Sequence, residues 1–119
     1  MTQQRVCRFE ELEVGRLKEA RIDNLSIVLA RTPDGRVFAL RDTCPHMGAK
    51  LSHGLLLEAF ESSDVDDYRL AEDRFVIRCP WHGYEFALED GRCLGDPERV
   101  RVRAYPVAVR DGEVWVERA

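Results

Sequence analysis

The fold is indicated most strongly by residues 75–83, which read Phe-Val-Ile-Arg-Cys-Pro-Trp-His-Gly. Four residues suited to a β-strand lead into Cys79, and His82 follows three positions later, just before a glycine. Residues 37–48 repeat this arrangement, because the strand-like segment Val37 to Arg41 precedes Cys44-Pro45-His46-Met47-Gly48. The sequence therefore predicts two loops, each presenting one thiolate and one imidazole at the end of a strand.

Short strands separated by turn signals are also expected through the rest of the chain. Apolar residues recur at alternate positions, as at Val100 and Val102 and again at Val107 and Val109, which is typical of strands with one buried face. The expected strands are Arg5 to Phe9, Leu17 to Ile22, Ser26 to Arg31, Val37 to Arg41, Phe75 to Arg78, Tyr84 to Leu88, Val100 to Arg103, Val107 to Arg110 and Val114 to Glu117.

Tight reversals are expected between these strands, at Pro33-Asp34-Gly35, Glu89-Asp90-Gly91 and Asp111-Gly112. Only Phe9 to Gly15 and Leu55 to Phe60 are suited to a helical turn. We therefore predict an all-β fold, a small antiparallel barrel or sandwich.

Length and composition limit the classes of protein that the chain can be. With 119 residues, 45% of them hydrophobic and 34% charged, it fits one globular domain, residues 1–119. A formal net charge of -4 argues against nucleic-acid binding, which requires a concentrated basic surface. No apolar run reaches the length of a membrane helix, and Met1 to Arg5 carry no signal-peptide pattern. We expect a cytoplasmic protein that contacts neither membranes nor nucleic acid.

The predicted ligands form a set of two thiolates and two imidazoles: Cys44, His46, Cys79 and His82. Such a set suits zinc or an iron-sulfur cluster. Cys7 and Cys93 have no neighbouring histidine and are predicted to be small hydrophobic residues, buried or half-buried. His53, the third histidine, is predicted to be a polar residue near the rim of the site rather than a further ligand.

The two loops resemble those of the Rieske family, whose cluster loops have the patterns C-x-H and C-x-x-H followed by glycine. The resemblance covers Cys44 to Ala49 and Cys79 to Phe86 and extends to the closing strands Tyr105 to Val109 and Glu113 to Glu117. It implies one [2Fe-2S] cluster per chain, with Cys44 and Cys79 on one iron and His46 and His82 on the other. The glycines after the ligands are expected to let backbone amides approach the inorganic sulfides.

Two departures from relatives in respiratory complexes bear on the reduction potential. Ala49 and Trp81 stand where those relatives have a disulfide, and Trp81 is expected both to pack and to shield the cluster. Tyr84 and Phe86 stand where a serine and a tyrosine donate hydrogen bonds to the cluster sulfurs. Fewer donors stabilise the reduced cluster less, so we expect a potential near the low end of the Rieske range.

The spacing between the two loops is a further departure, because 32 residues separate His46 from Cys79, about twice the separation usual in the family. Within a predicted cluster-binding subdomain of about 42–96, residues 57–73 look inserted and carry seven acidic residues against one arginine, a net charge of -6. A hairpin pairing Tyr68 to Leu70 with Phe75 to Ile77 is expected there. The segment is either a solvated loop or a surface that guides a basic partner.

Three functions remain open from the sequence. The first is a Rieske ferredoxin that carries single electrons from a flavin-dependent reductase to a terminal oxygenase or reductase. The second is a small subunit of a nitrite-reductase-like complex, and the third is a structural zinc module. A catalytic mononuclear iron site needs two histidines and a carboxylate, and only His53 remains. The chain is therefore not expected to be catalytic alone.

Overall fold

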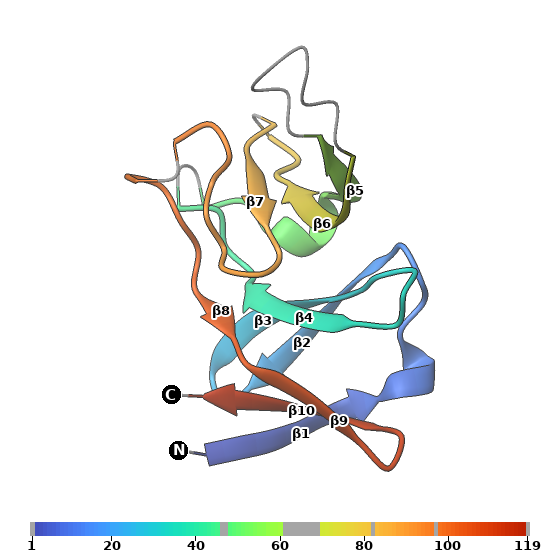
Figure 1. Cartoon of the computed structure of the whole chain (residues 1–119). Helices are drawn as coiled ribbons and strands as arrows, with labels where there is room; N and C mark the ends of the chain where they lie inside the picture. The colour runs from blue at the N-terminus through green and yellow to red at the C-terminus, as the bar shows by residue number, and fades with distance from the viewer. Residues whose placement is uncertain (1, 46–47, 61–69, 82, 97, 119) are drawn as a thin grey trace.

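The structure is a computed structural model that describes residues 2–45, 48–60, 70–81, 83–96 and 98–118 (Figure 1). Within these ranges, ten strands form three antiparallel sheets, which confirms the all-β prediction. The first sheet has the order β1-β10-β9, the second β2-β3-β4-β8 and the third β5-β6-β7. The strands are β1 (Thr2–Arg8), β2 (Leu17–Ile22), β3 (Leu25–Arg31), β4 (Val37–Arg41), β5 (Leu55–Phe60), β6 (Leu70–Arg78), β7 (Glu85–Ala87), β8 (Ala104–Tyr105), β9 (Val107–Arg110) and β10 (Glu113–Arg118).

Two short 3-10 helices interrupt the strands, η1 (Phe9–Glu11) and η2 (Leu51–His53). The first confirms the helical turn expected after Phe9. The predicted reversal at Asp111-Gly112 joins β9 to β10 with two residues, and both have positive φ, 52° and 74°. Such a turn matches the right-handed twist of the flanking strands.

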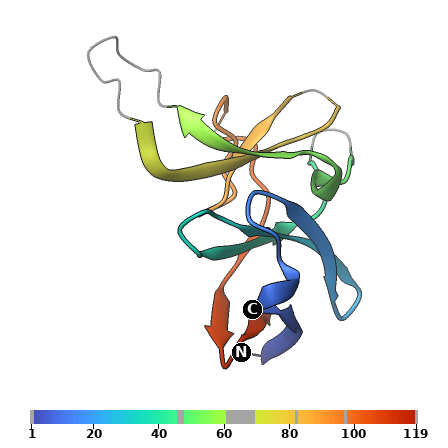
Figure 2. The same cartoon turned by 90° about the vertical axis from the view of Figure 1, so that its right-hand side faces the viewer.

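The second sheet lies between the other two and supplies both hydrophobic cores (Figures 1 and 2). Along β3, Ile27 and Leu29 pack toward the first sheet, whereas Val28 and Ala30 pack toward the third. All four side chains are buried, which explains why this strand reads as a continuous apolar run rather than an alternating one. The core between the second and third sheets contains the predicted cysteine ligands.

Three expectations about local structure are wrong. Leu55 to Phe60 form strand β5, because pairing with β6 outweighs the helical pattern of a short apolar run. The expected hairpin is absent, since Leu70 and Phe75 lie in the same strand, β6, and pair with Phe60 and Glu58 of β5. Val100 to Arg103 have the expected alternation of burial, but their one ladder contact is the isolated bridge at Arg101.

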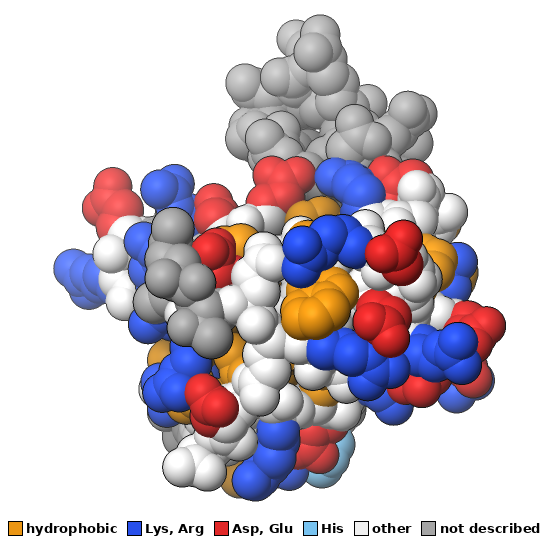
Figure 3. Space-filling model, turned by 90° about the horizontal axis from the view of Figure 1, so that it is seen from below, with side chains coloured by type: hydrophobic (Ala, Val, Ile, Leu, Met, Phe, Trp, Pro, Cys, Tyr) orange, Lys and Arg blue, Asp and Glu red, His pale blue; other side chains and the backbone are white. Residues whose placement is uncertain are grey.

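The large hydrophobic residues exposed within the described ranges are Val14, Leu55, Trp81, Leu94 and Val109. On the face seen in Figure 3, hydrophobic side chains form small separate groups among basic and acidic ones. Within the described ranges, no helix is long and apolar enough to span a membrane. The acidic segment 57–73 falls largely outside the described residues.

Candidate metal centre

The first predicted ligand loop, residues 44–49, follows β4 and is closed by two backbone hydrogen bonds. The N–H of Cys44 donates to the carbonyl of Ala49 over 2.8 Å, and the N–H of Gly48 donates back to the carbonyl of Cys44 over 2.8 Å. His46 and Met47 lie outside the described residues. The bonds hold the backbone of Cys44 in a tight turn at the end of its strand.

The second ligand loop, residues 79–84, repeats the same closure. The N–H of Cys79 donates to the carbonyl of Tyr84 over 2.7 Å, and the N–H of Gly83 donates to the carbonyl of Cys79 over 3.3 Å. In both loops the cysteine N–H binds the carbonyl five residues ahead, and the N–H four residues ahead returns to the cysteine. The two cysteines therefore occupy equivalent positions in equivalent turns, although one loop follows C-x-H and the other C-x-x-H.

Glycine is required in both turns by the backbone conformation. Gly48 has a φ of 74° and Gly83 a φ of 71°, in the left-handed region that other residues adopt only at a cost. A Cβ at either position would meet no described protein atom within 4 Å. Conformation is thus sufficient to explain these glycines, and the expected approach of amides to sulfides stays a prediction.

The thiols of Cys44 and Cys79 are buried in the same core, with 1% and 2% of each residue exposed. Cys93, 1% exposed, lies in that core too, whereas Cys7 lies in the other one. Burial raises the pKa of Cys7 above its ordinary value, with a smaller contribution from Glu11. The prediction that Cys7 and Cys93 are buried is confirmed, and all four cysteines are free thiols.

A buried carboxylate anchors the first loop. Asp42, 1% exposed and two residues before Cys44, accepts hydrogen bonds from the backbone N–H of Ser52 at 2.6 Å and from its hydroxyl at 2.7 Å. Its own N–H donates to the carbonyl of Ser26, whose hydroxyl also contacts the Asp42 carboxylate at 3.3 Å. This network, which we call the Asp42 clamp, joins β3, the first loop and η2. Sequence reasoning missed it, although an aspartate so close to a buried cysteine was a signal.

The two loops are held together through η2 and β6. Gly54, which ends η2, packs so closely on the carbonyl of Arg78 that a Cβ there would overlap it. Arg78 directly precedes Cys79 and forms an ion pair with Glu85, in which Nε and Nη2 both donate to Oε2, at 3.1 and 2.8 Å. The residues on either side of the second loop are thereby fixed to each other and to the segment that follows the first loop.

The remaining predicted residues are placed as follows. His82 lies outside the described residues, as His46 does. Trp81 is 60% exposed, so the expectation that it packs into the protein is wrong. Phe86 is fully buried, and its ring offers no hydrogen-bond donor. His53 is exposed on η2. The pKa of Glu19 is lowered chiefly by the hydrogen bond from Lys50, and His53 makes a smaller electrostatic contribution.

The donor chemistry of the described residues fits a metal centre in part. Two buried thiols, held in equivalent turns within one apolar core, suit a metal that prefers soft anionic ligands. The described residues contain no group of three or more Cys, His, Asp or Glu side chains placed to bind a metal. The two cysteines therefore form half of the predicted set, and the other half is the two histidines outside the described ranges.

Comparison with known proteins assigns the chain to a family. Residues 2–117 match the family model of the Rieske-like [2Fe-2S] domain. The 3-phenylpropionate/cinnamic acid dioxygenase ferredoxin subunit of Photorhabdus laumondii is 30% identical over 116 residues, which cover 98% of this chain and 94% of that protein.

Solved structures agree with this assignment. A protein of Mycobacterium tuberculosis assigned as the small subunit of an NADH-dependent nitrite reductase superposes with a TM-score of 0.83 at 30% identity, covering 99% of this chain and 96% of the other. The ferredoxin of carbazole 1,9a-dioxygenase from Nocardioides aromaticivorans superposes with a TM-score of 0.76 at 26% identity and covers both chains fully. The chain belongs to the Rieske-like [2Fe-2S] domain family.

Proposed function

We propose that this protein is a one-electron carrier that binds one [2Fe-2S] cluster per chain through Cys44, His46, Cys79 and His82. The observation that carries the proposal is the pair of equivalent turns that present two buried thiols from one core. Two thiolates and two imidazoles complete a four-ligand set of the Rieske type. When bound, the cluster supplies a centre that accepts and releases one electron.

The protein's own residues supply position and environment. The paired turns fix the cysteine backbones, and the Asp42 clamp and the Arg78–Glu85 pair fix the strands that lead into them. The apolar core around Cys44 and Cys79 excludes water from the thiolate side of the site. We also propose that residues 42–96 form the cluster-binding subdomain, with 57–73 as an insertion.

The partners we propose are a flavin-dependent reductase as electron donor and a terminal oxygenase as acceptor, with the carrier in the cytoplasm. The similarity to ferredoxin subunits of dioxygenases over nearly the whole chain supports this pairing. A second candidate is a small subunit of a nitrite-reductase-like complex, which the superposition with the Mycobacterium tuberculosis protein favours. Stable copurification with a large reductase subunit would distinguish the second role from that of a freely diffusing carrier.

The proposal is tested by quantifying iron, acid-labile sulfide and zinc in anaerobically purified protein and recording its visible and dithionite-reduced EPR spectra. We expect two irons and two sulfides per chain with a Rieske-type signal. Stoichiometric zinc in a colourless protein that cannot be reconstituted would identify the structural zinc module instead.

The ligand assignment has its own test in a matched pair of variants. Cys79→Ser is expected to abolish the visible spectrum, whereas Cys93→Ser, which alters an equally buried thiol of the same core, should keep it. Loss of the cluster in both variants, or in neither, would contradict the assignment of Cys79.

A further inference from the structure

We propose that five exposed arginines beside the first ligand loop form a docking surface for an acidic face of the electron-transfer partner. This arginine ridge consists of Arg41, Arg92, Arg99, Arg101 and Arg103. The inference rests on the proposed function, because a docking surface for an electron partner presupposes a carrier.

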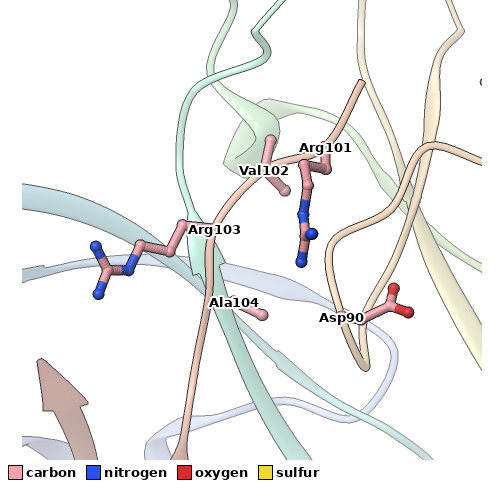
Figure 4. Close-up of a pocket in the computed structure, with 5 residues that line it drawn as sticks. All are labelled: Asp90, Arg101, Val102, Arg103 and Ala104. Carbon is pink, nitrogen blue, oxygen red and sulfur yellow. The ribbon is translucent and has the colours of Figure 1, made fainter. Parts of the chain in front are cut away.

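The backbone segments that carry the ridge lie side by side although its members are distant in sequence. The N–H of Arg41 donates to the carbonyl of Arg103 over 2.9 Å, and Arg92 and Arg101 face each other in an antiparallel bridge. An open hollow lies along residues 101–104 beside the turn at Asp90 (Figure 4). Arg101 points to the Asp90 side and Arg103 away from it, so the charge spreads over both sides of the segment.

The ridge stands out because most of its arginines form no ion pair within the described residues. Among the described residues, Arg92 pairs with Asp90 at 3.6 Å and Arg103 lies over the ring of Tyr105, 5.4 Å from its centroid, whereas Arg41, Arg99 and Arg101 have no ion pair. Elsewhere most exposed basic side chains have an acidic partner, including Arg5, Arg8, Arg16, Arg36, Lys50, Arg78 and Arg118. Arg92 and Arg101 stand opposite each other in a bridge, and like charges so placed destabilise the fold. Binding of an acidic group from another molecule would relieve this repulsion.

The ridge is firmly attached close to the candidate site. Val102 alternates with the arginines and packs into the core that contains Cys44 and Cys79. Arg41 is three residues from Cys44, so their Cα atoms are at most about 11 Å apart. A protein bound to this surface therefore lies within a short distance of the predicted cluster ligands.

An acidic protein face is the occupant that these features favour. Exposed guanidinium groups bind carboxylates in a bidentate manner, and arginine is enriched in protein interfaces. The chain as a whole carries a net charge of -4, so the ridge is a basic surface on an acidic protein, and this contrast orients an acidic partner toward the ridge. Nucleic-acid binding as a main activity requires a concentrated basic surface and usually a basic chain, and a net charge of -4 argues against it.

The first experiment measures binding of fluorescein-labelled poly-L-glutamate, as the probe for an acidic face, to the cluster-loaded protein by fluorescence anisotropy. In Arg99→Gln/Arg101→Gln the Kd is expected to rise about fivefold, equivalent to about 1 kcal/mol, and binding should weaken with salt. The control Arg8→Gln/Arg16→Gln removes the same charge from side chains remote in sequence from the ridge and should change the Kd less than twofold. Equal weakening in both variants would overturn the proposal.

A second measurement links the ridge to electron transfer. Ferricyanide should oxidise the reduced protein several-fold more slowly in the ridge variant than in the control; equal rates would overturn the role of the ridge. The proposal that the partner is an acidic protein would also be overturned if the ridge bound a DNA duplex more tightly than poly-L-glutamate. A salt-sensitive dimer in sedimentation equilibrium would overturn it too. Intact EPR signals in both variants show that the cluster is unaffected, whereas a chain that binds the probe but no cluster refutes the proposed function instead.

Discussion

Replacing Asp42 by alanine should destabilise the protein more than the same replacement of any exposed carboxylate. The clamp makes two short hydrogen bonds from Ser52, at 2.6 and 2.7 Å, and one longer contact from Ser26, at 3.3 Å. Hydrogen bonds to charged groups contribute about 1.5 to 3 kcal/mol each, and a buried N–H left unpaired costs about as much. Removing the buried charge offsets part of this loss. We expect the free energy of unfolding to fall by about 3 kcal/mol.

The measurement is urea denaturation of the cluster-free protein, with the rate of visible bleaching of the loaded protein as a second readout. A loss of about 3 kcal/mol is a large part of the roughly 5 to 15 kcal/mol that stabilises a typical domain. Bleaching should be faster because the clamp anchors the first ligand loop. Asp34→Ala, which removes an exposed carboxylate paired with Arg36, is the control and should change little. Equal losses in the two variants would refute the reasoning.

Three further predictions concern the potential, a turn and a surface pair. Because buried Phe86 cannot donate a hydrogen bond, the midpoint potential should lie near the low end of the range of about -150 to +300 mV; a titration giving a value well above zero would contradict this. Gly91→Ala should lower the urea midpoint far more than Gly35→Ala, because both positions have positive φ but only at Gly91 would a Cβ overlap a backbone carbonyl. Hydrogen bonding from Lys50 lowers the pKa of Glu19. The stabilisation from this pair is therefore present above the ordinary carboxyl pKa and is lost as the pH falls through the lowered pKa of Glu19. NMR titration should show the Glu19 pKa rising in Lys50→Met.

The parts of the fold that could be predicted from the sequence are those set by local pattern. The ranges of β2, β4 and β9 were predicted correctly because each is bounded by turn residues and has apolar residues at strand spacing. Strand β5 was not, since Leu-Leu-Leu-Glu-Ala-Phe has no period of two and becomes a strand only through its partner β6. Register across a long connection is a tertiary property that local pattern does not encode.

The candidate site shows the same division. The cysteines and glycines of the loops could be predicted because their chemistry and spacing are unusual. The Asp42 clamp could not, because its donors, Ser26 and Ser52, become neighbours only when β3 and η2 pack together. The exposure of Trp81 was likewise a matter of where the loop lies on the surface, not of residue type.

The β5–β6 hairpin keeps changes in residues 61–69 away from the second predicted ligand loop. Its register runs from Leu55 opposite Arg78, next to the second ligand loop, to Phe60 opposite Leu70 at the far end. Five residue steps of β5 at about 3.3 Å each place these ends about 17 Å apart, and the register shift between Glu58 and Phe60 accommodates the additional residues of β6. Residues 61–69 join the hairpin at the far end, so deletions or extensions there leave the strand positions that lead to Cys79 in register. The protein can thus acquire or lose residues between its two predicted ligand loops without a change in the strands that lead into the candidate metal centre.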